Sequence, residues 1–546
     1  MNKFDREYDV VIVGSGGAAL AAALGAHDAG LSAVMIESSA KWGGNSNKSG
    51  GGMWLPNNPL MRQEGAGDSR EEALTYLAAT AKNEYRATSP ARQEAFVDGV
   101  EDWVTTCQKY GIKLVRARDY ADYYPELPGG KIGRALEMYP IGLKPLGSWR
   151  KSMASAAALP IMTDDVWLLS RAFVTVSGFK RGVQLVLRTL RGLLTGKGIL
   201  GGIGVAFTGS LLRAAVVNGS AELLLETPMT DLIIENDRVV GVKATHKGTD
   251  VTIRARKGVI LGSGGFDGNR EKRKALQGIE GALSGVLTNL GLPIEIAERH
   301  GAALELMEDA WWGASVISAN PGVEDPSFLV GERAMPYSII VDDQGKRFAN
   351  EAESYIDIGH HMLEHNITGR WWMIADKRHR RYLRNYLLVP GVKKKLTAQG
   401  HYAEADTIEE LATKIGIEPN ALRETVDRFN GFAKTGIDGD FGRGNSAYDR
   451  YYSDPGVRPN PNLGPLEKAP FDAVELAIGD LGTKGGVLTD EHARALREDG
   501  SVIEGLYAAG NCSASVMGHT YPGPGSTLGP ATVFGLIAAR HIAQNG

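Results

Sequence analysis

A glycine-rich segment at residues 14–19, Gly-Ser-Gly-Gly-Ala-Ala, has the spacing by which proteins hold the diphosphate of a dinucleotide. Gly14 permits a tight turn, Gly16 lets the backbone approach the diphosphate, and Ala19 allows close packing of the following helix. The N–H groups and the dipole of that helix then attract the anion. Glu37 ends the next apolar run, where its carboxylate can accept hydrogen bonds from ribose hydroxyls. The combination predicts a dinucleotide site.

A second glycine-rich loop, residues 42–52, directly follows Glu37 and favours FAD over NAD. A domain for NAD alone would continue into another helix, whereas the diphosphate and ribityl chain of a flavin need further donors. Near the C-terminus, residues 507–511 precede a proline–glycine loop and a helix whose N-terminus can stabilise negative charge on a reduced flavin. The expected cofactor-binding residues are Gly14, Ser15, Gly16, Gly17, Ala18, Ala19, Glu37, Ser38, Gly43, Gly44, Asn45, Ser46, Ser49, Gly50, Gly51, Gly52, Met229, Gly264, Gly510, Asn511, Thr527 and Leu528.

A parallel sheet has to position these residues. The apolar runs 8–13 and 31–37 flank an Ala/Leu-rich helical segment, which predicts a βαβ unit. Short strands at 222–256 predict a small antiparallel meander, and 258–266 predicts another buried strand. Residues 315–475 mix helical and strand signals with many aromatic residues, which is typical of a separate inserted domain.

We therefore predict an α/β fold, with a Rossmann-like FAD-binding domain and an inserted α+β catalytic domain. The FAD-binding domain is expected to comprise 1–314, with an apolar and basic insertion at about 150–215, and to return at 476–546. The catalytic domain occupies 315–475 between its two parts.

Composition excludes several classes of function. With 43% hydrophobic and 23% charged residues, the chain of 546 residues can bury a large core and is not mainly disordered. A net charge of −4 gives no support to nucleic-acid binding. Cys107 and Cys512 are the only cysteines, which excludes a disulfide framework and a zinc-finger architecture. The N-terminal residues lack the apolar core of an export signal, so we expect a cytoplasmic protein.

Segments from about residue 8 to the C-terminus make the chain resemble the 3-ketosteroid Δ1-dehydrogenases, flavoproteins of the wider fumarate reductase/succinate dehydrogenase superfamily. The matching segments are SGGGMWLPNN (49–58), DYYPELPGGK (122–131), GVILGSGGF (258–266), ELMEDAWWG (305–313), GKRFANE (345–351), DLGTKGGVLTD (480–490) and the region 505–535. The resemblance implies non-covalent FAD, a 3-ketosteroid substrate in steroid or sterol degradation, and a quinone or another electron acceptor. It also implies that the 1α hydrogen leaves as hydride to flavin N5 and the 2β hydrogen as a proton.

The same resemblance gives roles to four residues. Tyr521 would hydrogen-bond the substrate ketone, together with the backbone N–H of Gly525. Tyr355 would be the general base, and Tyr124, the second tyrosine of DYYPE, would assist it. This chemistry is coherent, because two donors on a ketone oxygen acidify the hydrogen on the adjacent carbon. A phenol with a pKa near 10 needs help from a second hydroxyl and a polar or cationic neighbourhood. The alternative is that these are ordinary core tyrosines.

Two further functions remain open. A fumarate reductase-like enzyme acting on another carbonyl compound would need arginine and histidine to clamp carboxylates, whereas residues 345–366 offer tyrosine and apolar side chains. The other alternative is a non-catalytic flavoprotein that binds a sterol or carries electrons. Turnover of a 3-ketosteroid with an artificial acceptor separates the three.

Four histidines and two tryptophans are ambiguous. His360, His361 and His365 suggest metal ligands, but no carboxylate or cysteine completes a convincing set, so we predict solvated helix histidines and no metal site. His519 is expected to fix the local backbone. Trp311 and Trp312 fit equally well in the core and in a sterol pocket.

The segment 166–221 contains no Asp or Glu. Its basic residues are Arg171, Lys180, Arg181, Arg188, Arg191, Lys197 and Arg213. At about 100° per residue, the four between 180 and 191 fall within one arc of about 100°, and apolar residues occupy the remaining face. Two interpretations stay open. The helix either lies on the anionic inner face of the cell membrane, where sterols and quinones dissolve, or packs its apolar face on the core.

Overall fold

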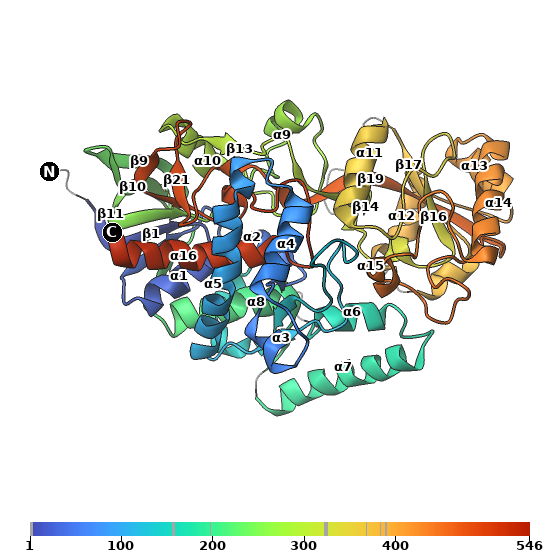
Figure 1. Cartoon of the computed structure of the whole chain (residues 1–546), viewed down its shortest axis with the longest axis horizontal. Helices are drawn as coiled ribbons and strands as arrows, with labels where there is room; N and C mark the ends of the chain where they lie inside the picture. Colours follow the sequence, from blue (N-terminus) through green and yellow to red (C-terminus); the bar gives the residue numbers. More distant parts are fainter. Residues whose placement is uncertain are drawn as a thin grey trace.

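The computed structural model describes residues 4–546, except 156–158, 197, 321–325, 367–368, 383 and 388–389. Two sheets dominate it and lie at opposite ends of the molecule in Figure 1. The sheet that begins with β1 lies at the end where both termini are found, and the sheet that contains β14 and β19 lies at the other. Helices pack around both sheets.

The first sheet is the expected Rossmann-like sheet. Its strand order is β21-β22-β10-β11-β1-β2-β8, and β9 pairs with β10. β1 pairs in parallel with β2 and β11, and β11 pairs in parallel with β22. Buried Val, Ile, Leu and Met side chains on both faces explain why these strands read as continuous apolar runs. The strands are β1 (Arg6–Val13), β2 (Ala33–Ile36), β8 (Glu222–Leu224), β9 (Met229–Glu235), β10 (Arg238–His246), β11 (Thr249–Leu261), β21 (Arg494–Leu496) and β22 (Val502–Ala508).

The predicted meander needs two corrections. β9, β10 and β11 are antiparallel neighbours as expected, but β8 leaves them and pairs in parallel with β2. The strands predicted at 250–256 and 258–266 are one continuous strand, β11, which ends at Leu261. Gly258 does not break it, because this glycine packs in extended backbone beneath Ile542 and Tyr507. One strand therefore serves both the meander and the parallel sheet.

Small residues allow the helices of this domain to approach closely. α1 (Gly17–Asp28) and α16 (Leu528–Asn545) pack together, and a Cβ on Gly25 would lie 2.9 Å from that of Ala539. α5 (Pro90–Lys109) packs on α16 through Gly99. Other helices around this part are α2 (Gly44–Lys48), α3 (Pro59–Gln63), α4 (Arg70–Ala81), α9 (Arg270–Gln277) and α10 (Leu292–Arg299).

The second sheet has the order β15-β14-β19-β17-β16, and β12 and β18 also pair with β19. It extends from Ala282 to Thr483 and so passes both boundaries of the predicted domain, 315–475, because β12 and β14 begin before residue 315 and β19 continues past residue 475. Its strands are β12 (Ala282–Leu283), β14 (Ala310–Val316), β15 (Ser327–Phe328), β16 (Ser338–Val341), β17 (Trp371–Ala375), β18 (Tyr402–Ala405) and β19 (Phe471–Thr483). Its helices are α11 (Tyr355–Asn366), α12 (Val392–Ala398), α13 (Ile408–Ile415), α14 (Pro419–Thr435) and α15 (Ala447–Tyr451).

The insertion at about 150–215 contains α6 (Thr163–Leu169), α7 (Val176–Leu194) and α8 (Ile203–Leu212). α8 is buried against α1 and α2, whereas α7 lies along the outer edge of the molecule (Figure 1). Within the described ranges, no helix combines the length and the apolar character needed to cross a bilayer. Short strands complete the fold: β3 (Gly52–Trp54), β4 (Leu114–Arg116), β5 (Ala135–Met138), β6 (Ile141–Gly142), β7 (Leu200–Gly201), β13 (Leu304–Glu305) and β20 (Gly486–Val487).

Candidate active site

The first glycine loop connects β1 to α1 and fits a diphosphate. Gly14 has a φ of 107°, and a Cβ there would lie 2.5 Å from the carbonyl oxygen of Gly262, so only glycine is accommodated. Gly16 is the N-cap of α1, and no side chain caps the helix. Apart from that of Gly17, which donates to Ser46 Oγ, the first-turn N–H groups of α1 therefore remain available to an anion.

The second glycine loop folds onto the first. The N–H of Gly43 donates to Ser15 Oγ at 3.0 Å, and the N–H of Gly17 donates to Ser46 Oγ at 2.9 Å. Gly43 and Gly44 have positive φ values of 102° and 50°, which explains the pair of glycines. Residues 14–19 and 43–46 are thus brought together as the sequence predicts.

Glu37 lies at the end of β2, beside the start of α1. Its carboxylate accepts from Ser15 Oγ at 2.6 Å and from the Ser39 N–H at 2.9 Å. Burial raises the pKa of Glu37, while these hydrogen bonds oppose the rise. The backbone N–H of Thr227 donates to the Glu37 carbonyl at 2.7 Å, which brings the segment leading to Met229 to the same place.

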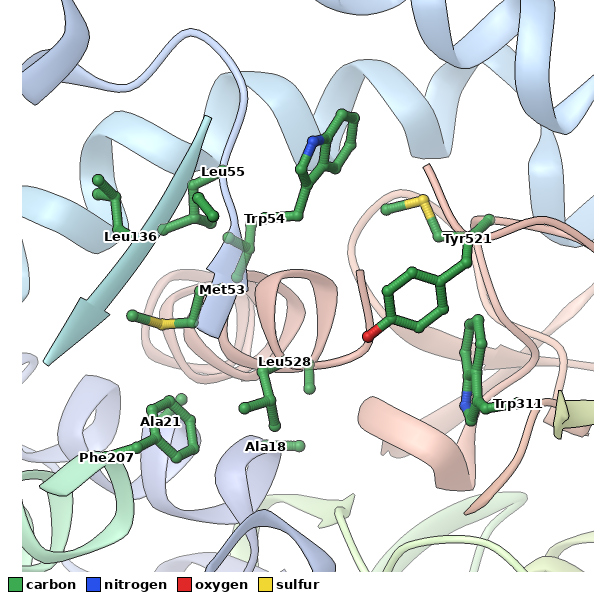
Figure 2. Packing of buried hydrophobic residues seen from close by; sticks show 14 of the residues in the cluster. Ala18, Ala21, Met53, Trp54, Leu55, Leu136, Phe207, Trp311, Tyr521 and Leu528 are labelled. Atoms are coloured by element: carbon green, nitrogen blue, oxygen red, sulfur yellow. The ribbon is translucent and has the colours of Figure 1, made fainter. Parts of the chain in front are cut away.

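The expected cofactor residues near the C-terminus lie beside the start of α1. Gly510 has a φ of 70°, and a Cβ there would lie 3.0 Å from that of Ala18, so the end of β22 reaches the start of α1. α16 begins at Leu528 after Thr527 and has no side-chain cap. Figure 2 shows Leu528, at the start of α16, above Ala18. Two uncapped helix N-termini therefore converge where the sequence places the cofactor.

Tyr355 and Tyr521 meet although they come from opposite parts of the chain. Tyr355 is the first residue of α11, and Tyr521 lies in the loop before α16. Both are buried, and their ring centroids are 5.0 Å apart. Burial raises the pKa of the Tyr355 phenol well above its usual value, and its hydrogen bond to Tyr521 adds to the rise.

The Tyr521 hydroxyl is directed toward the start of α16 (Figure 2). Burial raises the pKa of Tyr521, and hydrogen bonds from Tyr355, Thr527 and the Gly525 backbone N–H oppose that rise. Gly525 has a φ of 93°, and a Cβ there would lie 2.2 Å from the carbonyl oxygen of Gly52. Tyr521 and the Gly525 N–H, the two expected ketone donors, therefore lie together.

Of the two tyrosines of DYYPE, Tyr123 rather than Tyr124 packs against Tyr355 and Tyr521. The Tyr123 ring lies 5.4 Å from Tyr355 and 5.2 Å from Tyr521, measured between centroids. Tyr124 instead donates from its hydroxyl to Asp357 Oδ1 at 3.0 Å. Tyr123 and Tyr124 lie in a bend, where two adjacent side chains point in different directions, so the motif DYYPE alone does not separate the two. Sequence reasoning missed Tyr123 for this reason.

Aromatic rings extend the cluster in two directions. Trp311 packs edge-on against Tyr521 with centroids 5.3 Å apart, whereas Trp312 donates from Nε1 to Asp309 Oδ1 at 2.8 Å. Trp311 thus borders the tyrosines and Trp312 belongs to the core beside them. On the other side the rings continue toward α6, through the residues Tyr448, Tyr120, Tyr451 and Trp167.

The histidines pair with carboxylates rather than with solvent alone. His361 contacts Glu353 at 2.8 Å and His365 contacts Asp342 at 2.9 Å. His360 and His519 both contact Asp309. His361 and His365 remain open to solvent, with side chains 42% exposed, as expected of helix histidines, but each also has a carboxylate partner that the sequence did not indicate.

Comparison with known proteins shows which family the chain belongs to. The family model described as FAD binding domain matches residues 9–528. The chain is 43% identical to a 3-oxosteroid 1-dehydrogenase of Mycolicibacterium smegmatis, over 98% of this chain and 97% of that protein. It is 41% identical to a 3-oxosteroid 1-dehydrogenase of Mycobacterium tuberculosis, over 99% of both. A crystal structure of 3-ketosteroid delta1-dehydrogenase from Sterolibacterium denitrificans, in complex with 1,4-androstadiene-3,17-dione, superposes with a TM-score of 0.92 at 35% identity, covering 99% of this chain and 100% of that one.

Proposed function

This chain belongs to the 3-ketosteroid Δ1-dehydrogenases, and we propose that its buried tyrosine cluster carries the proton-transfer half of their reaction. The protein is an FAD-dependent oxidoreductase that removes hydrogen from C1 and C2 of a 3-ketosteroid to give the 1-ene. The observation that carries the site assignment is the meeting of Tyr355, Tyr521 and the Gly525 N–H within one buried cluster. When bound, FAD supplies the acceptor for the hydride that leaves C1.

Tyr521 and Gly525 polarise the substrate ketone in this proposal. Before substrate binds, the Tyr521 oxygen accepts hydrogen bonds from the Gly525 and Thr527 backbone, so its own proton is free to be donated. When the ketone binds, the Gly525 N–H would donate to the ketone oxygen in place of Tyr521. Accepting such bonds makes the phenol a stronger donor, because each favours its ionised form. Two donors on the ketone oxygen stabilise the enolate that develops when C2 loses its proton.

Tyr355 takes the C2 proton. Its phenol is buried and its pKa is raised, so an ionised Tyr355 is a scarce but strong base. Tyr123 rather than Tyr124 is proposed to assist it, because the Tyr123 ring contacts both other tyrosines. Of the polar or cationic neighbourhood that the sequence predicts, the polar form is present, because the groups that most affect the Tyr355 pKa are tyrosines.

A dye-coupled assay tests this function. The purified protein should convert a 3-ketosteroid with a saturated C1–C2 bond to the 1-ene, seen as a mass loss of two hydrogens, and should release FAD on heat denaturation. Tyr521→Phe should raise KM and lower kcat together. Reduction of fumarate without steroid turnover would support the dicarboxylate alternative, and yellow protein inactive on both substrates would support a non-catalytic flavoprotein.

We also propose that α7 rests on a membrane surface. Its apolar residues face outward: Leu194 is 87% exposed and Phe179 is 64% exposed, and Val183, Val186, Leu187, Leu190 and Leu193 are exposed as well. Only Gly178 and Gly192 of this helix are buried. An apolar face of this size on a helix that lies along the molecular edge fits the interfacial region of a bilayer.

The arrangement of the basic residues differs from the single basic face that the sequence suggested. Arg181 and Arg188 turn inward and bind the buried Asp165 of α6, at 2.8 Å and 2.5 Å. Lys180 and Arg191 are exposed at the edge of the apolar face, where they can attract anionic lipid. Lys197 lies outside the described residues. Arg188 is therefore unsuitable for testing lipid attraction, because it holds α7 in place.

Liposome co-sedimentation tests the membrane proposal. Wild type should bind vesicles of anionic lipid, and Leu187→Glu/Leu194→Glu should abolish binding, because charges would enter the apolar face. Lys180→Glu/Arg191→Glu should weaken vesicle binding, and the binding that remains should depend less on salt concentration. The matched control Leu287→Glu/Ile437→Glu changes two exposed apolar residues elsewhere and should bind as wild type does. Equal loss in the control, or no binding by wild type, would contradict the proposal.

We further propose a membrane quinone as electron acceptor, since it would dissolve where α7 docks. Vesicles that contain quinone should support steroid turnover without dye, and the Leu187→Glu/Leu194→Glu variant should lose this activity while retaining the dye-coupled one. If wild type and the variant reduce quinone equally well, docking of α7 is not needed for quinone to act as the acceptor.

A further inference from the structure

Asp309 lies where the chain passes between the two sheets. It immediately precedes β14, and Lys484 immediately follows β19. These two strands are antiparallel neighbours, with Ala310 paired to Thr483, so the entry of the chain into β14 and its exit from β19 meet at this point. Lys484 Nζ lies 2.8 Å from Asp309 Oδ2, and both side chains are buried.

The Asp309 carboxylate holds four other donors besides Lys484. Oδ1 accepts from the N–H of Ala310 at 2.8 Å and from Trp312 Nε1 at 2.8 Å, and His360 Nε2 lies 3.0 Å away. Oδ2 contacts His519 Nδ1 at 2.7 Å. Burial alone would raise the pKa of Asp309, but Lys484 and the two histidines hold it well below its usual value. The group is therefore a buried carboxylate with a full set of partners.

Each histidine of this cluster belongs to an element that carries one catalytic tyrosine. His360 lies on α11, the helix that begins with Tyr355. His519 lies in the loop that carries Tyr521, two residues before it. Trp311, which packs edge-on against Tyr521, follows Asp309 on β14. One carboxylate thus touches both tyrosine-bearing elements and the strand between them.

We propose that Asp309 is a positioning residue, which sets the distance between Tyr355 and Tyr521 through His360 and His519. The inference rests on the proposed roles of these two tyrosines. Its physical basis is that Tyr355 begins helix α11 whereas Tyr521 lies in the loop before α16, so nothing in the local chain fixes their separation. A hydrogen-bonded carboxylate at the junction of the two sheets supplies that constraint. A misplacement of about 1 Å can lower a rate about 100-fold.

Asp309, His360 and His519 also have the composition of a metal site, with ligand atoms within 4.8 Å of one another. The Lys484 ammonium argues against a cation there. It lies 2.8 Å from Asp309 Oδ2, the same oxygen that His519 contacts at 2.7 Å. A metal would have to displace a buried positive charge or lie beside it. The hydrogen-bonded cluster is therefore the arrangement that we favour.

Paired substitutions test the inference. His360→Leu and His519→Leu remove the contacts to Asp309, whereas His360→Gln and His519→Asn keep an N–H donor near Nε2 and Nδ1 respectively. We expect each leucine variant to lower kcat 10- to 100-fold with FAD retained and KM changed less than threefold. The Gln and Asn variants should recover most of kcat. The kcat of the double leucine variant should be no lower than that of the worse single variant, because both histidines act through one carboxylate.

His365→Leu is the matched control, because His365 lies on the same helix and pairs with Asp342 instead. It should keep wild-type kcat. The inference is overturned if the leucine variants keep kcat within twofold of wild type, or if His365→Leu lowers kcat as much as they do. It is also overturned if the two decreases in kcat multiply in the double variant, or if the variants lose FAD or fail to fold. Stoichiometric metal in purified wild type would also overturn it. If wild type itself fails to turn over steroid, the proposed function is at fault instead.

Discussion

Tyr355 is buried among other tyrosines, and this burial decides how its activity should depend on pH. The base must be ionised, and burial holds the pKa of its phenol well above 10. Below that pKa the ionised fraction rises about tenfold per pH unit, so kcat/KM should rise from pH 7 to about pH 10 without a plateau. Tyr355→Phe should lower kcat by roughly 10²–10⁴ and abolish this rise.

The measurement is steady-state kinetics with a dye acceptor at fixed ionic strength. Tyr139→Phe, which changes a half-buried tyrosine outside the cluster, should keep the wild-type profile. A plateau near pH 7, or near wild-type turnover by Tyr355→Phe, would show that Tyr355 is not the base.

Gly525 shows how strictly backbone geometry is set beside the ketone. An added Cβ would lie 2.2 Å from the Gly52 carbonyl oxygen, at a φ of 93° that disfavours any side chain. Gly525→Ala should therefore shift the N–H donor and lower kcat about 100-fold or more. Gly400→Ala is the matched control, because Gly400 also has a positive φ of 77° but has open space around its Cβ position. It should cost about 1–2 kcal/mol of stability and leave kcat unchanged. Equal kcat for the two variants would contradict this account.

α7 depends on one buried carboxylate for its position on the protein. Asp165 is buried and accepts from Arg181, Arg188 and the N–H of Met162. Breaking a buried pair from one side costs about 3–5 kcal/mol, and less here because both arginines are partly exposed. Asp165→Asn should therefore loosen α7 without unfolding the sheets.

Limited trypsin digestion followed by mass spectrometry measures this effect. Cleavage within 176–196 should be several-fold faster in Asp165→Asn than in wild type, while dye-coupled kcat stays within a few-fold. Asp98→Asn, which changes an exposed partner of Arg70, should digest as wild type does. Unchanged digestion of Asp165→Asn would mean that apolar packing alone holds α7.

At the scale of the whole molecule, the cofactor site joins distant parts of the chain. Its expected residues run from the β1–α1 loop to the start of α16, and the two uncapped helix N-termini converge there. FAD should therefore stabilise the folded chain by mass action, by about 2.7 kcal/mol at a free concentration of 100 Kd. Thermal unfolding of apoprotein with added FAD, with NAD as control, measures the shift. A Tm that rises equally with NAD would contradict the cofactor assignment.

The sequence alone determined the features that depend on neighbouring residues. The order of apolar run, glycine loop, helix and Glu37 predicted the β1–α1–β2 unit, because tight turns and helix starts follow from local backbone sterics. The motifs around Tyr355 and Tyr521 indicated the family, which the comparisons confirm. They also selected the two tyrosines that the structure brings within 5.0 Å of one another.

Only the tertiary structure decided which of two equivalent local patterns is used. DYYPE does not say whether Tyr123 or Tyr124 faces Tyr355, because the choice depends on contacts with α11 and the Tyr521 loop. The amphipathic pattern of 176–194 fits a core helix and a surface helix equally, and the buried Asp165 turned the arginines inward and left the apolar face exposed. His360 and His519 gained a shared partner, Asp309, that is distant in sequence from both. Such choices depend on side chains that meet only after the two sheets have packed, and no local periodicity encodes them.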